Sequence, residues 1–157
     1  MRMPILQPLP IPTKKVPSLI CRIYIWIFSI REWEVKEEWS YKLPNGVIIV
    51  IPKGFVFDGA SIPRPLWMLL SPTGLLLIPG LIHDYAYRYD KLVCRDEQGN
   101  LIDYQKGAGK AHWDKLFRDV GIEVNGIAFI DVLAWLALFI GGWFTWRKHR
   151  KNDKKEA

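Results

Sequence analysis

The feature that most constrains this chain is a nearly uninterrupted apolar stretch, GIAFIDVLAWLALFIGGWFTW, at residues 126–146. A helix of this length matches the hydrocarbon core of a bilayer, which is about 30 Å thick. Trp143 and Trp146 lie at its charged end, as aromatic residues do at a membrane interface. The alternative is a core helix of the globular domain, which Asp131 favours, because an acid near the middle of a bilayer costs roughly 2.5–3.5 kcal/mol. Both interpretations, membrane anchor and core helix, stay open.

The segment that follows, residues 147–157, is a basic tail. It holds six basic and two acidic residues and so carries +4 of the chain's net charge of +6. A basic segment directly after an apolar helix is typical of contact with anionic lipid headgroups on the cytoplasmic side. We therefore expect a phospholipid membrane as a partner. Nucleic acid is an unexpected partner, because no basic patch with interleaved aromatic residues occurs elsewhere.

The remaining chain has the length of one domain. Residues 1–19 contain prolines that oppose helix and strand ladders, which predicts an extended arm over the surface. Residues 20–125 predict a single α+β domain. Cys21 and Cys94 stand alone without metal-ligand spacing, so neither a disulfide scaffold nor a zinc site is indicated.

A small antiparallel sheet is predicted over about residues 20–58. Residues 20–30 alternate isoleucine with aromatic residues, which is typical of a strand covered on both faces. The segment from Trp33 to Tyr41 predicts a second strand with Trp33, Val35, Glu37, Trp39 and Tyr41 on one face. Asn45-Gly46 predicts a tight turn and residues 47–51 the returning strand. Asp58 then opens a proline-rich segment that predicts a rigid, non-helical course able to hold a site.

Two amphipathic helices follow the sheet. The first is predicted from about Leu81 to Leu92, with Pro79-Gly80 at its start. The second is predicted from about Lys110 to Val120, with Gly121 placed to end it. The polar segment between them predicts a loop or small ribbon.

A candidate catalytic group lies in the stretch LIHDYAYRYD, residues 81–90. His83 and Tyr87 are four residues apart and share a helix face, while Asp84 points about 100° away. Asp114 borders the buried stripe of the second helix. If the two helices pack antiparallel, Asp114 can accept the Nδ1 proton of His83 and leave Nε2 free to take a proton from water. Asp84 would then be available for a hard cation.

The same residues have plainer interpretations. His83 can be a structural histidine in a core, and Asp58 can cap its own backbone turn. Asp114 can pair with Arg118 and Asp84 with Arg88, each pair worth a few tenths of a kcal/mol.

Three segments in this order resemble a family of small phage and prophage proteins. They are IPKGFVFDGASIPRPLW, LIHDYAYRYD and WDKLF, and the family is domain of unknown function 1353. The likeness covers roughly residues 33–140. It implies a viral or prophage origin and brings no established activity.

A fainter resemblance concerns the mechanism. His83-Asp84-x-x-Tyr87, followed by Asp114, is similar to the HDxxY helix and the later aspartate helix of phospholipase A2 proteins, most nearly the parvovirus kind. The likeness implies His83 as general base, Asp114 as its orienting partner and Tyr87 as support for that aspartate. It implies Asp84 as a calcium ligand, with Asp58 as a further candidate. The segment SPTGLLLIPG departs from the glycine-rich calcium loop of that family, which puts the calcium site in doubt.

Two functions therefore stay open. One is a calcium-dependent, phospholipase A2-like lipid or ester hydrolase associated with a membrane. The other is a non-enzymatic phage component, either a structural part of the virion or an entry or lysis-associated factor that binds other phage proteins. In that case the histidine and aspartates form a structural polar network. The expected location is the host cytoplasm or inner membrane with the basic C-terminus cytoplasmic, or the virion.

Overall fold

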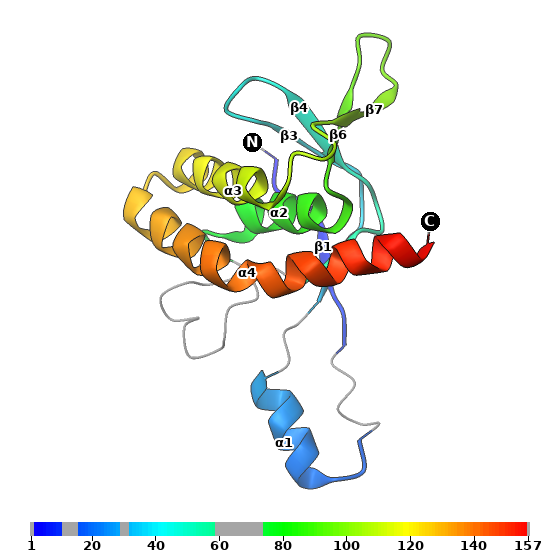
Figure 1. The fold of residues 1–157 in the computed structure, drawn as a ribbon, viewed down its shortest axis with the longest axis vertical. Coiled ribbons are helices and arrows are strands. Elements are labelled where there is room, and N and C mark those ends of the chain that lie inside the picture. Colours follow the sequence, from blue (N-terminus) through cyan, green and yellow to red (C-terminus); the bar gives the residue numbers. More distant parts are fainter. Residues whose placement is uncertain (1, 11–15, 29–31, 59–73, 157) are drawn as a thin grey trace.

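The computed structural model is an α+β protein, and its described residues form two antiparallel sheets and four helices, the last of which is long and begins with an apolar part (Figure 1). It describes residues 2–10, 16–28, 32–58 and 74–156. The strands are β1 (Leu6–Pro8), β2 (Trp33–Val35), β3 (Trp39–Lys42), β4 (Ile48–Ile51), β5 (Val56–Phe57), β6 (Leu92–Arg95) and β7 (Leu101–Tyr104). The helices are α1 (Leu19–Phe28), α2 (Leu77–Tyr89), α3 (Lys110–Asn125) and α4 (Ala128–Glu156). The sequence-based expectation for residues 59–73 lies outside the described residues.

The smaller sheet has the strand order β1-β2-β5. Its edge strand β1 comes from the proline-rich arm and runs antiparallel to β2, with Leu6 opposite Val35 and Pro8 opposite Trp33. An edge position tolerates Pro8, which cannot donate to a ladder. The arm is thereby tied to the domain by backbone pairing.

The larger sheet has the order β3-β4-β6-β7. The predicted turn is confirmed, because Gly46 has φ of +88° between β3 and β4. The prediction of one strand from Trp33 to Tyr41 is wrong. The chain leaves the first sheet after Val35 and enters the second at Trp39, with Glu37 exposed between them. Glu37 occupies a position expected to face the core, and burying its charge without a partner would be costly. The row of inward-facing side chains is therefore interrupted there.

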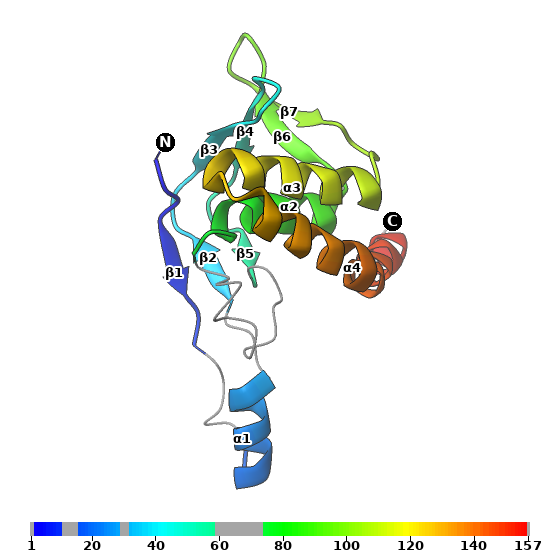
Figure 2. The same cartoon turned by 90° about the vertical axis from the view of Figure 1, so that its left-hand side faces the viewer.

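The strand predicted at residues 20–30 is also wrong, because Leu19–Phe28 form helix α1, while residues 29 and 30 lie outside the described residues. A short run that is apolar at nearly every position fits a helix as well as a strand, and periodicity cannot separate them. In both views α1 projects from the rest of the protein (Figures 1 and 2). Its residues Leu19, Ile20 and Ile23 are exposed.

The helices α2 and α3 occur where the sequence predicts them, with different ends. Helix α2 begins at Leu77, so Pro79 and Gly80 lie in its first turn, where a missing N–H is tolerated. Leu92, expected in this helix, is a buried residue of β6. Helix α3 continues past Gly121 to a left-handed cap at Gly126. The segment between the helices forms the β6-β7 ribbon.

Helix α4 packs on both α2 and α3 and is bent along its length (Figure 1). The part Ala128–Lys151 is long and apolar enough to cross a membrane by length and composition. Most of it is nevertheless exposed at one side, while Asp131, Ala134 and Gly142 are buried at the other. The close approach to α3 depends on Gly121, because a Cβ there would meet the carboxylate of Asp131.

The main core lies between the two sheets and one side of α2 and α3. Large buried side chains fill it, namely Trp39, Ile49, Ile51, Phe55, Leu81, Ile82, Tyr85, Trp113 and Val120. A second, smaller cluster joins α2, α3 and α4 through Leu76, Phe117 and Ala134. His83, in LIHDYAYRYD, lies between these clusters, with its ring against Tyr87 of the first and Phe117 of the second.

Candidate functional site

The antiparallel packing of α2 and α3 brings His83, Tyr87 and Asp114 together. Nε2 of His83 lies 3.0 Å from Oδ1 of Asp114, and the Tyr87 hydroxyl donates to the same oxygen at 2.6 Å. The predicted pairing of helices and residues is thus confirmed, but the predicted ring nitrogen is wrong. Nε2, not Nδ1, faces Asp114. On α2 the imidazole packs against the ring of Tyr87, with centroids 4.0 Å apart and planes tilted by 37°, and this packing fixes which edge reaches α3.

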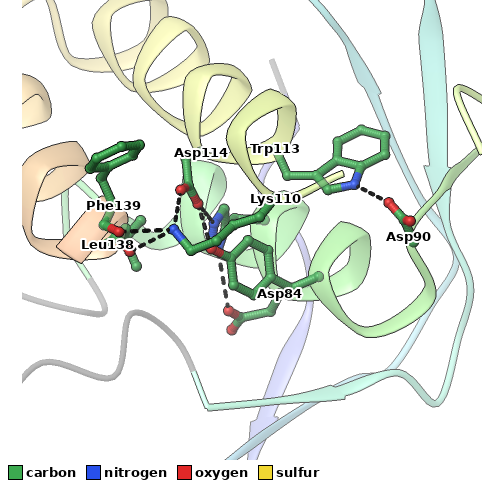
Figure 3. A network of polar contacts seen from close by, with 9 residues as sticks. Asp84, Asp90, Lys110, Trp113, Asp114, Leu138 and Phe139 are labelled. Atoms are coloured by element: carbon green, nitrogen blue, oxygen red, sulfur yellow. Dashed lines mark hydrogen bonds and ion pairs between the residues drawn. The ribbon is translucent and has the colours of Figure 1, made fainter. Parts of the chain in front are cut away.

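Asp114 has a third partner that sequence reasoning missed. Nζ of Lys110 donates to Oδ2 of Asp114 at 2.5 Å and to the backbone carbonyls of Leu138 and Phe139 at 3.2 and 3.1 Å (Figure 3). Lys110 stands four residues before Asp114, so helical spacing was an available signal. The expected pair with Arg118 is wrong, because that side chain turns to Asp119. Asp114 therefore connects α3 to α2, and Lys110, which it binds, connects α3 to α4.

The electrostatics of this group follow from burial and pairing. The side chains of Asp114 and His83 are 0% and 4% exposed. Burial alone raises the pKa of Asp114, but hydrogen bonds from His83, Lys110 and Tyr87 outweigh it and hold the pKa below its usual value. Burial likewise lowers the pKa of His83, yet the Asp114 and Asp84 carboxylates raise it above its usual value. Asp114 is thus a stable anion, and His83 retains its proton more readily than a free histidine.

Asp84 occupies the other side of the imidazole. Its Oδ1 lies 3.9 Å from Nδ1 of His83, which is an ion-pair distance and too long for a hydrogen bond. Burial and the nearby charge of Asp58 raise the pKa of Asp84 to about 7. The expected pair with Arg88 is wrong, because that guanidinium points to the carbonyl of Val56. The second oxygen of Asp84, Oδ2, is buried without a hydrogen-bond partner.

A cleft of about 640 Å³ opens beside these groups. One wall comes from β5 and α2 and includes Phe57, Asp58, Gly80, His83, Asp84 and Tyr87. The opposite wall is one edge of α4, with Ala137, Gly141, Thr145, Lys148 and His149. The lining is mainly apolar with a few convergent polar groups, which is typical of a binding site for a small molecule or an acyl chain.

A second polar junction closes the far end of α2. Asp90, in a left-handed conformation, accepts a hydrogen bond from the backbone N–H of Gly109 at 3.0 Å. It also accepts one from the indole N–H of Trp113 at 2.8 Å (Figure 3). Arg150 of α4 donates to the carbonyls of Tyr87 and Arg88 at 3.0 and 2.7 Å. A cation at the C-terminal end of a helix is stabilising. The basic segment, predicted only as a lipid contact, therefore also has an internal role.

The predicted metal ligands lie together but are few. Asp58 and Asp84 line the same cleft, and the unpaired Oδ2 of Asp84 suits a hard cation that prefers oxygen. Calcium takes about six to eight oxygens, however. Within residues 2–10, 16–28, 32–58 and 74–156, no group of three or more acidic, histidine or cysteine side chains is arranged to hold a metal. The carboxylates fit part of a cation shell.

Fold and site together define a small α+β protein with a helix-borne histidine–aspartate pair beside an apolar cleft. The chain belongs to the family "Protein of unknown function (DUF1353)", whose model matches residues 33–138 and so includes every residue of the pair. It is similar to "Uncharacterized protein y4jT" of Sinorhizobium fredii, with 29% identity over 83 residues. That match covers 52% of this chain and 25% of the relative, so the chain spans about a quarter of the protein it resembles. No solved structure matches it.

Proposed function

We propose that the protein is a lipid or ester hydrolase in which His83 activates water. The observation that carries this proposal is the orientation of the imidazole. Nε2 is hydrogen-bonded to the buried Asp114, and His83 lines the cleft together with Asp84. Because a carboxylate holds Nε2, the nitrogen that would act as the general base is Nδ1, which lies on the side of the ring next to Asp84.

The chemistry uses the two ring nitrogens differently. Nε2–H donates to Asp114, which fixes the neutral tautomer with a lone pair on Nδ1. Nδ1 takes a proton from water as its oxygen bonds to the ester carbonyl carbon. The imidazolium, stabilised by Asp114, then returns that proton to the leaving alkoxide as the carbon–oxygen bond breaks. The products are a carboxylic acid and an alcohol, and no oxidant or reductant is needed.

Tyr87 and Lys110 act as positioning residues in this scheme. Both donate to Asp114, so the carboxylate cannot rotate away from His83 without losing two further bonds. A calcium ion at Asp84, as the likeness to phospholipase A2 implies, with Asp58 as a further ligand, would supply positive charge for the ester oxygen. The apolar cleft and the long apolar helix favour a lipid as the substrate class.

The proposal is tested with purified full-length protein on mixed micelles that contain phospholipid and calcium. Released fatty acid is measured for wild type, His83→Gln and the matched control His112→Gln. His112 lies on α3, where its Nε2 is hydrogen-bonded to Oε1 of Gln105. We expect activity in wild type and in the control and its loss in His83→Gln, with circular dichroism showing that the variant is folded.

The competing candidate is a non-enzymatic component, and one observation favours it. The Lys110–Asp114 pair ties α2, α3 and α4 together and would be useful without any reaction. In that case wild type is inert on phospholipid and on soluble esters, and His83→Gln lowers stability alone. A phage or prophage origin and binding to other phage proteins stay predictions, and co-purification from infected cells is the measurement for them.

A further inference from the structure

Helix α4 has two apolar faces with different surroundings. Its inner face carries Asp131, Ala134, Leu138, Gly142 and Trp146, spaced by three or four residues and buried or half-buried against α2 and α3. This spacing is that of one helix face. The inner face is therefore already occupied by the domain itself.

The outer face is a continuous exposed stripe. It is formed by Phe129, Leu133, Leu136, Ile140 and Trp143, again at spacings of three and four. Phe129 is 77% and Ile140 is 76% exposed, so these side chains have no cover within the described structure. A contiguous apolar stripe of this kind marks an interaction surface.

The inner contacts oppose a spanning orientation of α4. Asp131 lies within the apolar stretch, and Asn125 donates to its carboxylate at 2.8 Å. Lys110 holds two carbonyls halfway along the same helix. A helix that crossed a bilayer alone would carry Asp131 into hydrocarbon and leave the ammonium of Lys110 with fewer partners, which is costly. A helix lying along the surface keeps both contacts.

Charge identifies the occupant of the stripe. The exposed residues Arg147, Lys148 and Lys151 continue the outer side of α4 directly after the apolar part. If the stripe of a second copy of the chain packed on this one, these cations would face either the cations or the apolar side chains of that copy. No exposed acidic residue lies on α4 between Ala128 and Lys151 to pair with them. An anionic bilayer surface satisfies both parts, since lipid chains cover the apolar side chains and headgroups pair with the cations.

We propose that α4 lies along the surface of an anionic bilayer and brings the mouth of the cleft to the lipid. The edge of α4 that lines the cleft, with Ala137, Gly141, Thr145 and Lys148, runs between the inner face and the outer stripe. When the stripe is embedded, this edge is at the headgroup level. Lys148 then stands where a lipid phosphate would enter. The role of the cleft rests on the proposed hydrolase function, while the surface orientation does not.

The first experiment measures binding of full-length protein to preformed vesicles by flotation. Vesicles of phosphatidylcholine alone are compared with vesicles that also contain phosphatidylglycerol. The double variant Ile140→Ser, Phe144→Ser changes a stripe residue and the adjoining Phe144 of α4, which are 76% and 81% exposed. It is compared with Ile48→Ser, Leu101→Ser, whose targets are 54% and 50% exposed on the larger sheet. We expect binding that requires phosphatidylglycerol, a loss of about tenfold or more in the α4 variant, and no change in the control. Equal binding by both variants overturns the proposal, as does a dimer in light scattering that only the α4 variant loses.

The second experiment determines orientation and the link to the cleft. The protein carries a tag at each end and is bound to sealed vesicles. External protease removes both tags if α4 lies along the surface and only one tag if α4 crosses the bilayer. The α4 variant should lose hydrolysis of vesicle lipid yet retain hydrolysis of a short soluble ester. Protection of one tag refutes only the surface orientation and leaves the proposed hydrolase function standing. Intact binding without any hydrolysis refutes the proposed function alone.

Discussion

The packing of α4 on the site can be tested at two neighbouring glycines. A Cβ added at Gly142 would lie 2.7 Å from the hydroxyl of Tyr87 and 3.3 Å from Cε of Lys110, whereas one at Gly141 meets nothing within 4 Å. In both positions alanine is the better helix residue by about 0.5–1 kcal/mol. The two substitutions also have the same effect on the unfolded chain. Their difference therefore measures the contact between α4 and the site.

We expect Gly141→Ala to stabilise the protein by about 0.5–1 kcal/mol. Gly142→Ala must push Tyr87 from Asp114 or lift α4, and overpacking of this kind costs about 1–3 kcal/mol. The variants should thus differ by about 1–3 kcal/mol in free energy of unfolding, with each kcal/mol corresponding to about 2–4 °C in Tm for a domain of this size. The net effect of Gly142→Ala is expected to be destabilising.

The assay is urea unfolding in mild detergent, followed by tryptophan fluorescence. Trp146 reports locally, because its ring meets that of Tyr87 at 5.1 Å between centroids. Circular dichroism provides an independent probe of the same transition. Equal stabilisation by both alanines would refute the reasoning, since it would mean that α4 does not pack on α2 and α3.

Four further outcomes follow from the site. Asp84 has a folded pKa of about 7, above the usual carboxyl value, so its contribution to stability is present at pH 4 and lost as pH rises through 7. Asp84→Asn should therefore be more stable than wild type at pH 8, by about 1–3 kcal/mol, and equally stable near pH 4, as measured by urea unfolding. If calcium binds the anionic carboxylate, it should raise the Tm of wild type at pH 8 and leave that of Asp84→Asn unchanged; equal shifts would exclude this residue as a ligand. Lys110→Met keeps the apolar stem but leaves Asp114 short of its cation, so a loss of about 3–5 kcal/mol is expected, and a loss below about 1 kcal/mol would show that the pair is dispensable. Gly121→Ala forces a Cβ against Oδ1 of Asp131 and should lower the Tm by several degrees, in contrast to the usual gain from a glycine-to-alanine change in a helix.

The histidine–aspartate pair could be predicted from sequence because its signals are local. The spacing of His83 and Tyr87 defines one face of a helix, and Asp114 borders the buried stripe of the next helix. Two antiparallel helices joined by a short ribbon bring such faces together. The identity of the ring nitrogen could not be predicted, since it depends on the χ2 angle of His83 within a three-dimensional packing with Tyr87 and Phe117.

Other parts of the site were missed because their partners are distant or ambiguous. Arg150 reaches the carbonyls of Tyr87 and Arg88, more than sixty residues earlier, and no local pattern encodes that contact. Lys110 had helical spacing to Asp114, but so did Arg118 on the other side, and spacing alone cannot choose between them. Helix α4 determines that Lys110 is the partner of Asp114, because the carbonyls of Leu138 and Phe139 bind the ammonium of Lys110.

At the level of sequence, α4 was either a membrane helix or a core helix. The sequence shows how apolar the helix is, but it does not show whether each face packs on the domain or is exposed. A spanning helix is apolar all around because lipid surrounds it. The helix α4 is apolar all around for two reasons, with one face against α2 and α3 and the other exposed. The position of the acid within the apolar part of α4 separates these cases, because Asp131 lies on the inner face where Gly121 leaves space and Asn125 supplies a donor. An acid matched by a glycine and an amide on a neighbouring helix indicates packing within the domain, and the apolar remainder is then free to meet a lipid surface.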